Sequence, residues 1–534
     1  MKRGEHSLED ISTLNRSPQR GGPVAPGLVP ALTIVSHPKI QRSGERVLLR
    51  ELLAGREVPL SRTEPLFARP GAVQGLPLAD PFLSRKPLRL LPGAQGGVRL
   101  LVGSSAPVIV EGEPLSSERE LEPATLAAGV TLELAERVVL LLHLVQPADK
   151  EVAEELGMVG QSAAVRRVRR QVMQVADLDV SVLIRGETGT GKELVARALH
   201  QHGLRRKGPF ISVNLGAIPK ELAAAELFGA ERGSYTGATQ SREGFFRAAQ
   251  GGTLFLDEVA EASSEVQVLL LRVLETGEMF PVGSRTPVKT QVRLVAATDA
   301  HLEEQIQQGQ FKAPLLHRLA GYEVRVPPLR ERREDLGLLL LHFARQELEA
   351  LGEAWRLESQ EASAEPWLPA SLASRLVRYP WPGNVRQLRN VTRQLIISSR
   401  GMPSLQVDPQ LEQELVALPA SSPATPPPIT PVPRALTEAR RKPSEVSEEE
   451  MMAALREHAW DMAAAANQLG ITRASLYNLM KKSARARTAK DLSVEQIRQS
   501  YQECGGNLEL MAQRLEVSFR ALQRRVRELG LEAD

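Results

Sequence analysis

Apolar residues occur along the chain in three patterns that indicate three kinds of fold. Between residues 31 and 146, short apolar runs such as Leu32–Val35 and Val138–Val145 alternate with turn residues. Several short strands separated by turns predict an N-terminal β-sandwich. The preceding residues 1–30 are polar and rich in Pro and Gly, which predicts a disordered leader.

A second pattern covers residues 156–400. Strand-length runs rich in β-branched residues, such as Val180–Ile184 and Thr253–Leu256, alternate with helical stretches, one of which begins near Lys220. Continuous apolar runs are typical of strands that are buried on both faces of a parallel sheet. The alternation predicts a doubly wound α/β domain.

The last region changes composition twice. Residues 401–445 are rich in Pro, Ser, Thr and Ala, which predicts an extended linker. Residues 446–534 are helical in pattern and repeat themselves with an offset of 46 residues, as from Asp461 to Asn507. The offset also relates Ala466, Leu469, Thr472, Leu476 and Met480 to Ala512, Leu515, Ser518, Leu522 and Val526. Two copies of one helical unit are expected.

Composition narrows the class of protein. The chain has 534 residues, a formal net charge of +3 and one cysteine, Cys504, which excludes an intramolecular disulfide. Its most apolar run, Val138–Val145, is far shorter than the ~20 residues that span a bilayer. We therefore expect a cytoplasmic protein that does not insert into a membrane, in which DNA binding depends on local basic clusters near the C-terminus.

The strand at Val180–Ile184 leads into a glycine-rich loop and a helix. Gly186 is followed after four residues by Gly191 and Lys192, the Walker A spacing, in which backbone amides surround a phosphate and the lysine reaches the outer phosphates. Glu193 stands where most such loops carry Ser or Thr. The predicted ATP-binding residues of this loop are Gly186, Glu187, Thr188, Gly189, Thr190, Gly191, Lys192 and Glu193.

A second strand, Thr253–Leu256, ends in Asp257 and Glu258. This is the Walker B arrangement, in which the aspartate holds Mg²⁺ and the glutamate polarises the attacking water. Paired acids at a strand end can instead cap a helix. With the Walker A motif upstream, we favour ATP and Mg²⁺ as the cofactors.

Between these motifs lies Gly233-Ser234-Tyr235-Thr236-Gly237-Ala238, which resembles the GAFTGA signature of bacterial sigma-54-dependent activators, a branch of the AAA+ ATPases. Four of the six positions match, and the aromatic tip is retained as Tyr235. The resemblance covers residues 156–400. It implies that these six residues contact sigma-54 RNA polymerase and that the protein forms a ring, expected to be a hexamer.

The resemblance also assigns further residues. It implies that Thr298 and Asp299 sense the γ-phosphate and that Arg386 contacts nucleotide from a helical lid. It further implies that Asn214 orients Glu258 and that Arg318 acts on the site of the neighbouring subunit. The chain departs from the family pattern at Asp299, commonly Asn, and at two positions near Arg318, where Lys312 replaces an arginine and Pro314 an aspartate.

Each C-terminal copy has the pattern of a helix-turn-helix, and residues 446–484 resemble the Fis-type element of the same activators. The second copy spans residues 490–534. The alternative is a helical dimerisation bundle with solvated charges. The expected contacts with double-stranded DNA upstream of promoters are Thr472, Arg473, Ser475, Tyr477, Asn478, Lys481, Arg520, Gln523 and Arg524.

In the sandwich, Ser61-Arg62, Ser84-Arg85 and Glu111-Gly112 occupy positions that resemble the peptide-binding loops of forkhead-associated domains. Arg62, Ser84 and Arg85 are therefore candidates to hold a phosphopeptide from a phosphoprotein partner. A sandwich used only for protein contact is the alternative.

The sequence as a whole predicts a sigma-54-dependent transcription activator that binds upstream DNA and uses ATP hydrolysis to open promoters. A second hypothesis is a DNA-binding co-regulator with a weakened ATPase, motivated by Asp299, Lys312 and Pro314. A third, an AAA+ remodeller outside transcription, does not account for the GSYTGA loop or the helix-turn-helix repeat.

Overall fold

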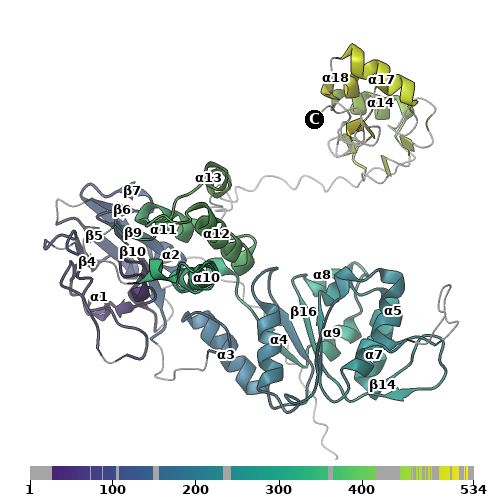
Figure 1. Ribbon diagram of the computed structural model, residues 1–534, viewed down its shortest axis with the longest axis horizontal. Helices are drawn as coiled ribbons and strands as arrows, with labels where there is room; N and C mark the ends of the chain where they lie inside the picture. Colours follow the sequence, from purple (N-terminus) through teal and green to yellow (C-terminus); the bar gives the residue numbers. More distant parts are fainter. Residues whose placement is uncertain are drawn as a thin grey trace, which may run out of the picture. The chain divides into compact units, whose positions relative to one another are not determined.

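The computed structural model describes residues 27–416 and 446–526, with gaps inside both ranges. The gaps are 73, 87, 104–106, 148–154, 232–241, 359–364, 459, 461–464, 467, 472–474, 477–478, 481–482, 484–491, 505–507, 516, 518–521 and 524. The chain divides into two compact units, Met1–Pro423 and Ala424–Asp534 (Figure 1). The predicted multidomain fold class is confirmed: a β-rich region, an α/β domain with a helical lid and a C-terminal helical region follow one another.

Two antiparallel sheets form the N-terminal region. The first has the order β2-β1-β10-β9-β6-β7 and the second the order β3-β4-β5-β8. Their strands are β1 Val29–Ser36, β2 Arg46–Leu48, β3 Val58–Leu60, β4 Leu88–Pro92, β5 Val98–Leu101, β6 Val108–Val110, β7 Glu113–Pro114, β8 Glu118–Leu121, β9 Val130–Leu134 and β10 Val138–Val145, with short helices α1 Arg50–Leu53 and α2 Pro123–Ala128.

Apolar side chains at alternate positions along the strands form the core between the two sheets. Leu32 and Ile34 of β1 share one apolar cluster with Leu88 and Leu90 of β4 from the opposite sheet. Burying a leucine side chain fully contributes roughly 1.5–3 kcal/mol. All eight residues of β1 are buried, so its other face is also covered.

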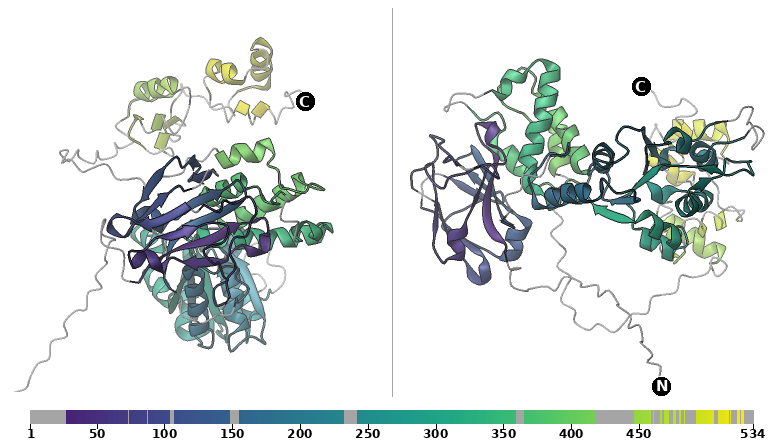
Figure 2. Two further views of the ribbon diagram at one scale, coloured as in Figure 1. Left: turned by 90° about the vertical axis from the view of Figure 1, so that its left-hand side faces the viewer. Right: turned by 90° about the horizontal axis from the view of Figure 1, so that it is seen from below.

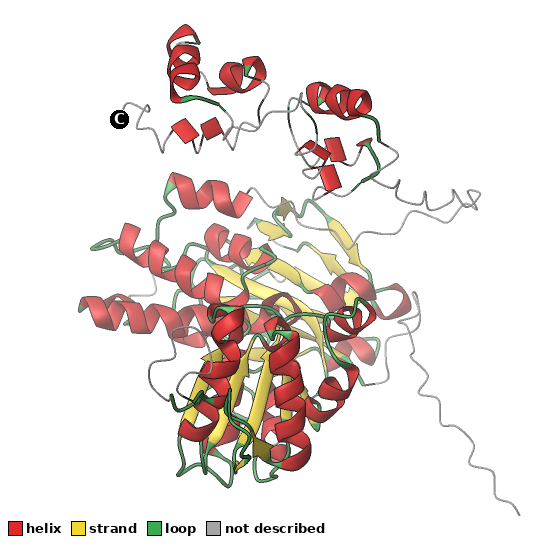
Figure 3. Cartoon of the chain, turned by 90° about the vertical axis from the view of Figure 1, so that its right-hand side faces the viewer, coloured by secondary structure: helices red, strands yellow, loops and turns green. Residues whose placement is uncertain are grey.

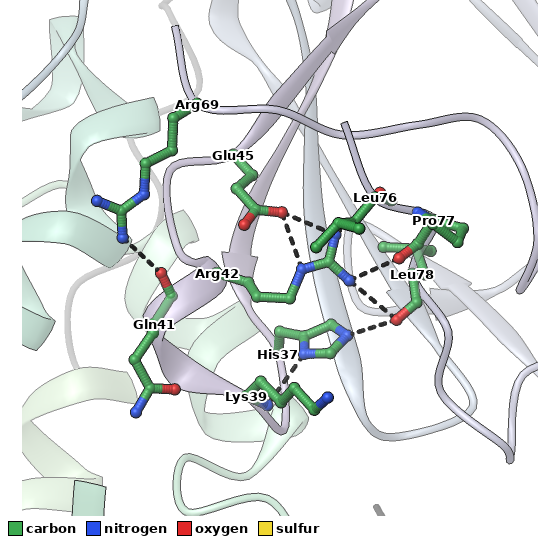
Figure 4. Close-up of polar contacts among 9 residues, drawn as sticks. All are labelled: His37, Lys39, Gln41, Arg42, Glu45, Arg69, Leu76, Pro77 and Leu78. Atoms are coloured by element: carbon green, nitrogen blue, oxygen red, sulfur yellow. Dashed lines mark hydrogen bonds and ion pairs between the residues drawn. The ribbon is translucent and has the colours of Figure 1, made fainter. Parts of the chain in front are cut away.

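A long connection between β3 and β4 is held to the sandwich by Arg42 (Figure 4). The buried guanidinium of Arg42 donates to the backbone oxygens of Leu76, Pro77 and Leu78 and pairs with Glu45 at 2.7 Å. A segment without regular structure would otherwise leave these carbonyls unsatisfied. One arginine thereby fixes residues 76–78 of the connection, which further along carries Ser84 and Arg85.

The α/β domain contains a five-stranded parallel sheet in the order β12-β13-β16-β11-β17. Figures 1 and 3 show helices on both of its faces. The elements are α3 Ala163–Val175, β11 Val182–Arg185, α4 Lys192–Gln201, β12 Phe210–Asn214, α5 Lys220–Phe228, α6 Phe245–Ala248, β13 Thr253–Asp257, α7 Ser264–Thr276, β14 Glu278–Met279, β15 Val288–Lys289, β16 Arg293–Thr298, α8 Leu302–Gln307, α9 Ala313–Leu319 and β17 Tyr322–Arg325.

The strands of this sheet are apolar on both faces, as the sequence predicted. In β13, Leu254 and Leu256 pack with the α5–α9 side, whereas Phe255 packs with α3 and α4. The two-residue period of a strand sends alternate side chains to opposite faces. The sheet therefore lies between two helical layers, with its carboxyl ends at one edge.

The lid follows as α10 Leu336–Leu351, α11 Ala370–Arg378, α12 Asn384–Ser398 and α13 Pro409–Val416. The prediction of an extended linker from residue 401 was wrong for its first part. Leu405 and Leu411 are buried in the lid core, and Leu415 packs against it. The proline-rich composition of the wider segment masked this short apolar pattern.

The lid also covers the outer face of β1 and β10. Val35, Ile40, Val139 and Leu141 of the sandwich belong to the same apolar cluster as the lid helices. Figure 2 shows the green lid helices beside the purple strand. Arg378 of α11 donates to the backbone oxygen of Glu111 at 2.9 Å, so polar contacts join the apolar ones.

In the C-terminal unit, two helices begin with the same cap. Ser447 and Glu450 form a capping box at the start of α14 Glu448–Glu457, and Ser493 and Gln496 form another at α17 Val494–Glu503. The offset from Ser447 to Ser493 is again 46 residues, in agreement with the sequence repeat. The described residues also include α18 Leu508–Arg514.

Corresponding side chains fill two separate small cores in this unit. Ala466, Leu476 and Met480 lie in one, and Ala512, Leu522 and Val526 lie in the other. Among the described helices of the whole chain, none combines the length and apolarity that would span a membrane.

Candidate functional site

The glycine-rich loop runs from the end of β11 to the start of α4. Gly191 directly precedes α4 in a left-handed conformation, with φ 103°. Gly189 also has a positive φ, 79°, and a Cβ there would lie 2.4 Å from the backbone oxygen of Gly383. Both positions favour glycine, because a side chain would strain the backbone and, at Gly189, collide with the lid.

Lys192 is the first residue of α4 and is nearly buried. Its ammonium donates to the backbone oxygen of Gly186 at 2.8 Å, so it lies folded over the loop. Burial lowers the pKa of Lys192, whereas the nearby carboxylates of Asp299, Asp257 and Glu258 act in the opposite direction. The structure thus brings three predicted site residues near the ammonium of a fourth.

Asp257 and Glu258 lie at the carboxyl end of β13, next to Asn214 of β12 in the sheet register. The backbone of Glu258 is left-handed, with φ 55°, and its N–H donates to the Asp257 carboxylate at 3.1 Å. Such a conformation is strained for a residue other than glycine and often marks a functional site.

Asn214 does not hydrogen-bond to Glu258 within the described residues. Its side-chain oxygen accepts from the backbone N–H of Ala217 at 3.2 Å and caps the short helix η3 Leu215–Ala217. A Cβ on Gly216 would lie 2.2 Å from a Glu258 carboxylate oxygen and 3.3 Å from the side-chain oxygen of Asn214. The two side chains therefore share one small space.

Thr298 ends β16 and Asp299 follows it, as the sequence predicted. The Asp299 carboxylate accepts a hydrogen bond of 2.6 Å from the hydroxyl of Thr188 in the glycine-rich loop. Thr298 contacts the glycine-rich loop through its backbone, because its carbonyl accepts a hydrogen bond from the N–H of Gly186 at 3.2 Å. An ionised carboxylate can only accept, and here the loop supplies the donor.

The lid meets the loop through Arg386 and Asn384 of α12. The Arg386 N–H donates to the Gly189 carbonyl at 3.2 Å. The buried side chain of Asn384 donates to the Glu187 carboxylate and to the Thr188 carbonyl, both at 3.1 Å. Sequence reasoning missed Asn384, although it lies two residues before Arg386 in the WPGNVR stretch.

A second missed group lies between the sheet and the lid. Arg330 forms two hydrogen bonds with Glu187, and Arg332 donates to the carbonyl of Thr190 at 3.3 Å. The predicted ATP-binding residue Glu187 is therefore held by Arg330 of the short helix η5 Leu329–Glu331. Thr190 is held by Arg332, which lies between η5 and the short helix η6 Arg333–Asp335.

An apolar cavity of about 90 Å³ opens beside the loop. Met158, Val159, Leu194, Phe343 and Val385 line it, together with the loop residues Thr190 and Gly191. A flat apolar group fits such a lining, and the polar loop lies next to it. The segment before α3, Gly157 to Val159, carried no motif that sequence reasoning could use.

Glu193 does not face this site. Its carboxylate pairs with Arg197 one turn further along α4 at 2.7 Å, and about half of each side chain is exposed. Asp257 therefore remains the predicted metal ligand at the strand end. The described residues contain no group of three or more His, Cys, Asp and Glu that could hold a metal ion.

Arg318 and Lys312 lie exposed on α9 and its N-cap. The Arg318 guanidinium is 3.6 Å from the carboxylate of Glu275 in α7. Within the described residues, the side chains of Arg318 and Lys312 make no hydrogen bond to the Lys192 site of the same chain. Pro314 occupies the first turn of α9, where its missing N–H is no loss. The substitution at this position is thus compatible with the helix.

The predicted sigma-54 contact, Gly233 to Ala238, lies outside the described residues. Its flanks are anchored, because Ala230 pairs with Arg242 and with Val282. Of the predicted DNA contacts, only Ser475 and Gln523 are described, both on helical residues. Outside the description lie Thr472, Arg473, Tyr477, Asn478, Lys481, Arg520 and Arg524.

In the sandwich, Arg62 and Ser84 lie side by side, because the Arg62 N–H donates to the Ser84 carbonyl at 3.4 Å. Arg85 is exposed next to them. The Glu111 carboxylate accepts from the N–H and hydroxyl of Thr131, at 2.5 and 2.9 Å.

Comparison with known protein families agrees with this arrangement. Residues 158–325 match the sigma-54 interaction domain, residues 330–421 match an AAA+ ATPase lid domain, and residues 442–482 match the Fis family of bacterial regulatory proteins. The lid match extends past residue 400, in agreement with the position of α13.

The chain is also similar to curated transcriptional regulators. It is 49% identical over 250 residues to the DNA-binding transcriptional regulator NtrC of Azospirillum brasilense, covering 47% of this chain and 50% of that protein. The NtrC protein of Escherichia coli K12 is 46% identical over 248 residues, covering 46% and 51%. The chain therefore spans about half the length of these relatives.

Among solved structures, NtrX from Brucella abortus in complex with ADP is 31% identical, with a TM-score of 0.42, and the alignment covers 62% of this chain and 69% of NtrX. The resemblance rests instead on the three matched domains and the glycine-rich loop. By this domain content, the chain is similar to the sigma-54-dependent activators of the AAA+ ATPases.

Proposed function

We propose that this protein is a transcription activator that hydrolyses ATP to remodel sigma-54 RNA polymerase for promoter opening. One observation carries the proposal: Lys192, Asp257, Glu258 and Asp299 converge on the glycine-rich loop of a domain that matches the sigma-54 interaction family. The Fis-family match supports DNA binding by the same chain.

ATP would lie with its adenine in the apolar cavity and its phosphates over the loop. Val159 and Phe343 would contact the base, and the loop amides with Lys192 would hold the phosphates. Mg²⁺, when bound, neutralises phosphate charge, and Asp257 is the residue at the strand end that would hold it. Asp257 fits this role because carboxylate oxygens are preferred ligands of Mg²⁺.

Glu258 would accept the proton of the attacking water. Its left-handed backbone directs the carboxylate away from β13 and toward the space shared with Asn214. Asn214 would restrict the position of that carboxylate by packing. Asp299 would act through Thr188, holding the loop, and not by donating to the γ-phosphate.

Completion of the site would require a second copy of the chain. Arg318 is exposed on α9, paired only at 3.6 Å with Glu275, and is available to a neighbouring subunit. A trans-acting arginine contributes about 10³- to 10⁵-fold in rate in related phosphoryl-transfer enzymes. We propose a ring, expected to be a hexamer, whose loops from Gly233 to Ala238 contact sigma-54.

The remaining predicted contacts are part of this proposal. The C-terminal repeat would place Thr472, Arg473, Ser475, Tyr477, Asn478 and Lys481 on double-stranded DNA, with Arg520, Gln523 and Arg524 from the second copy. In the sandwich, Arg62, Ser84 and Arg85 would hold a phosphopeptide, and the adjacent positions of Arg62 and Ser84 support this.

Glu258→Gln tests the activity. The variant should bind ATP as wild type does and lose turnover, and with it the ATP-dependent opening of a sigma-54 promoter. Glu261→Gln, which alters an exposed acid on the next short helix, η4 Val259–Glu261, is the matched control and should retain both. Unchanged hydrolysis by Glu258→Gln would remove this residue from the proposed role.

A further inference from the structure

A second cavity, of about 260 Å³, lies where the sandwich, the start of α3 and the segment of residues 330–334 meet. It is separate from the apolar cavity beside the glycine-rich loop, and the two share no lining residue. Its polar lining has three sources. Arg46, His143 and Gln146 come from the sandwich and the residue that follows β10, and Arg166 and Arg167 come from α3. The segment of residues 330–334 supplies Arg330, Glu331, Arg333 and Glu334.

Charge in this cavity is unbalanced, with five arginines against two glutamates. Arg330 is already paired with Glu187, and Arg333 donates to the backbone oxygens of Ala128 and Gly129 at 2.8 and 2.9 Å. The guanidinium groups of Arg46 and Arg166 make no hydrogen bond or ion pair of 4 Å or less within the part of the chain that the structure describes.

Arg166 is also close enough to Arg46 to disfavour the charge of Arg46. Burial lowers the pKa of Arg46, and the charge of Arg166 adds to that effect. The carboxyls of Glu334 and Asp335 act on Arg46 in the opposite direction, but burial, followed by the neighbouring Asp335, raises the pKa of Glu334 to about 7, so that carboxyl offsets the arginine charges only in part. Partly buried cations whose charge is incompletely offset are costly, so a bound anion would reduce their repulsion.

The lining also limits the kind of anion. Apart from His143, whose imidazole hydrogen-bonds to the Thr33 hydroxyl at 2.8 Å, the described lining has no aromatic side chain on which a nucleobase could stack. The apolar contribution comes from small or aliphatic residues such as Ala127, Gly129 and Leu141. The space suits a compact, multiply charged group.

We propose that this cavity is a binding site for a small multivalent anion bearing phosphate or carboxylate groups, held between Arg46 and Arg166. The guanidinium fork is suited to both groups, since it offers paired N–H donors. The proposal does not depend on ATP hydrolysis, and anion binding can be measured without it.

The cavity is connected to the ATP site by one short segment. Arg333 contacts the sandwich and lines the cavity, Arg332 and Arg330 contact the glycine-rich loop, and Asp335 accepts from Ser162 at the N-cap of α3. An anion bound beside Glu334 would therefore act on residues that hold the loop. This gives the sandwich a direct route to the nucleotide site.

The test is anion binding by the full chain saturated with ADP, which blocks phosphate binding at the glycine-rich loop. Inorganic phosphate, pyrophosphate and citrate are titrated by calorimetry. The wild type should bind at least one of them, and Arg46→Gln or Arg166→Gln should weaken that binding about tenfold or more. Arg50→Gln, an exposed arginine next to the sandwich strand β2 that does not line the cavity, should leave it unchanged.

Two controls keep the result interpretable. Arg46→Lys retains the charge and should bind more weakly than wild type but better than Arg46→Gln, and equal thermal unfolding of these variants shows that the sandwich is intact. Failure of all three anions to bind wild type would overturn the proposal. So would binding that survives both glutamine variants or disappears in Lys192→Ala, since the anion would then lie elsewhere.

Discussion

The carboxylate of Glu187 accepts two hydrogen bonds from the guanidinium of Arg330, at 2.7 and 2.5 Å. Glu187 belongs to the glycine-rich loop, whereas Arg330 belongs to the segment that leads into the lid. These hydrogen bonds lower the pKa of Glu187, and Asn384 of the lid donates to the same carboxylate. One loop side chain thereby joins three parts of the nucleotide site.

Arg330→Lys should weaken this connection, because lysine keeps the charge but cannot form both hydrogen bonds. About half of each side chain is exposed, so the free energy of unfolding should change by less than about 1 kcal/mol. ATP affinity, measured by fluorescence titration, should fall severalfold since the lid and loop are less firmly joined. Arg393→Lys, in a pair that joins two lid helices, is the control. Equal affinity in both variants would contradict the connection.

Asp299→Asn should tighten ATP binding. The asparagine oxygen can still accept from Thr188, while the negative charge near the phosphates is removed. Removing one such charge contributes about 1 to 2 kcal/mol, which is roughly tenfold in affinity. Binding is measured without Mg²⁺ to prevent turnover, with the exposed Asp177→Asn as control. Weaker binding by Asp299→Asn would show that the carboxylate itself is required.

His143 should make the N-terminal sandwich sensitive to acid. Burial lowers its pKa to about 3, with Arg46 and Arg333 acting in the same direction. Between pH 6.5 and 3 the unfolded chain binds a proton that the folded chain does not, so stability falls as pH falls, by about 1.4 kcal/mol per unit. Above pH 6.5 neither state binds this proton, so the folded state keeps its full stability there.

The measurement is the unfolding temperature between pH 5 and 7.5. His143→Gln should lower it at pH 7.5, because the bond to Thr33 is disturbed, but should reduce its dependence on pH. His37, whose pKa burial lowers to about 4, leaves a residual slope. The exposed His317→Gln should keep the wild-type slope. An unaltered slope in His143→Gln would contradict the assignment.

Local motifs explain what the sequence could predict. Lys192 and Asp257 could be predicted because each comes soon after an apolar strand in the sequence. A glycine-rich loop connects the first strand to Lys192, and Asp257 directly follows the apolar run of the second. The parallel sheet then brings them together, because the carboxyl ends of its strands meet at one edge. The position of Asp299 at the end of β16 was predictable for the same reason.

The contacts that sequence reasoning missed depend on tertiary packing. Arg330 and Asn384 lie more than 140 residues from Glu187 in the chain, and no local spacing indicates that they meet it. Helix α13 was missed because three leucines in a proline-rich region give too weak a pattern. Glu193 was predicted to bind ATP because of its position in the Walker A motif. Its side chain instead pairs with Arg197 on the surface of the helix.

The central claim, an ATP site completed between subunits, is tested by mixing two inactive variants. Lys192→Ala lacks its own site but supplies Arg318, and Arg318→Ala retains its site but lacks the arginine. Each alone should be nearly inactive, and an equimolar mixture of full chains should recover about a quarter of wild-type hydrolysis if subunits mix at random in a head-to-tail ring.

Mixing Lys192→Ala with Glu258→Gln is the matched control and should recover nothing, since both defects lie on the same side of the interface. Recovery in the first mixture alone would establish the shared site. Absence of recovery, when the two variants co-elute as an assembly and Arg318→Ala still binds ATP, would contradict the account and favour a DNA-binding co-regulator with a weakened ATPase.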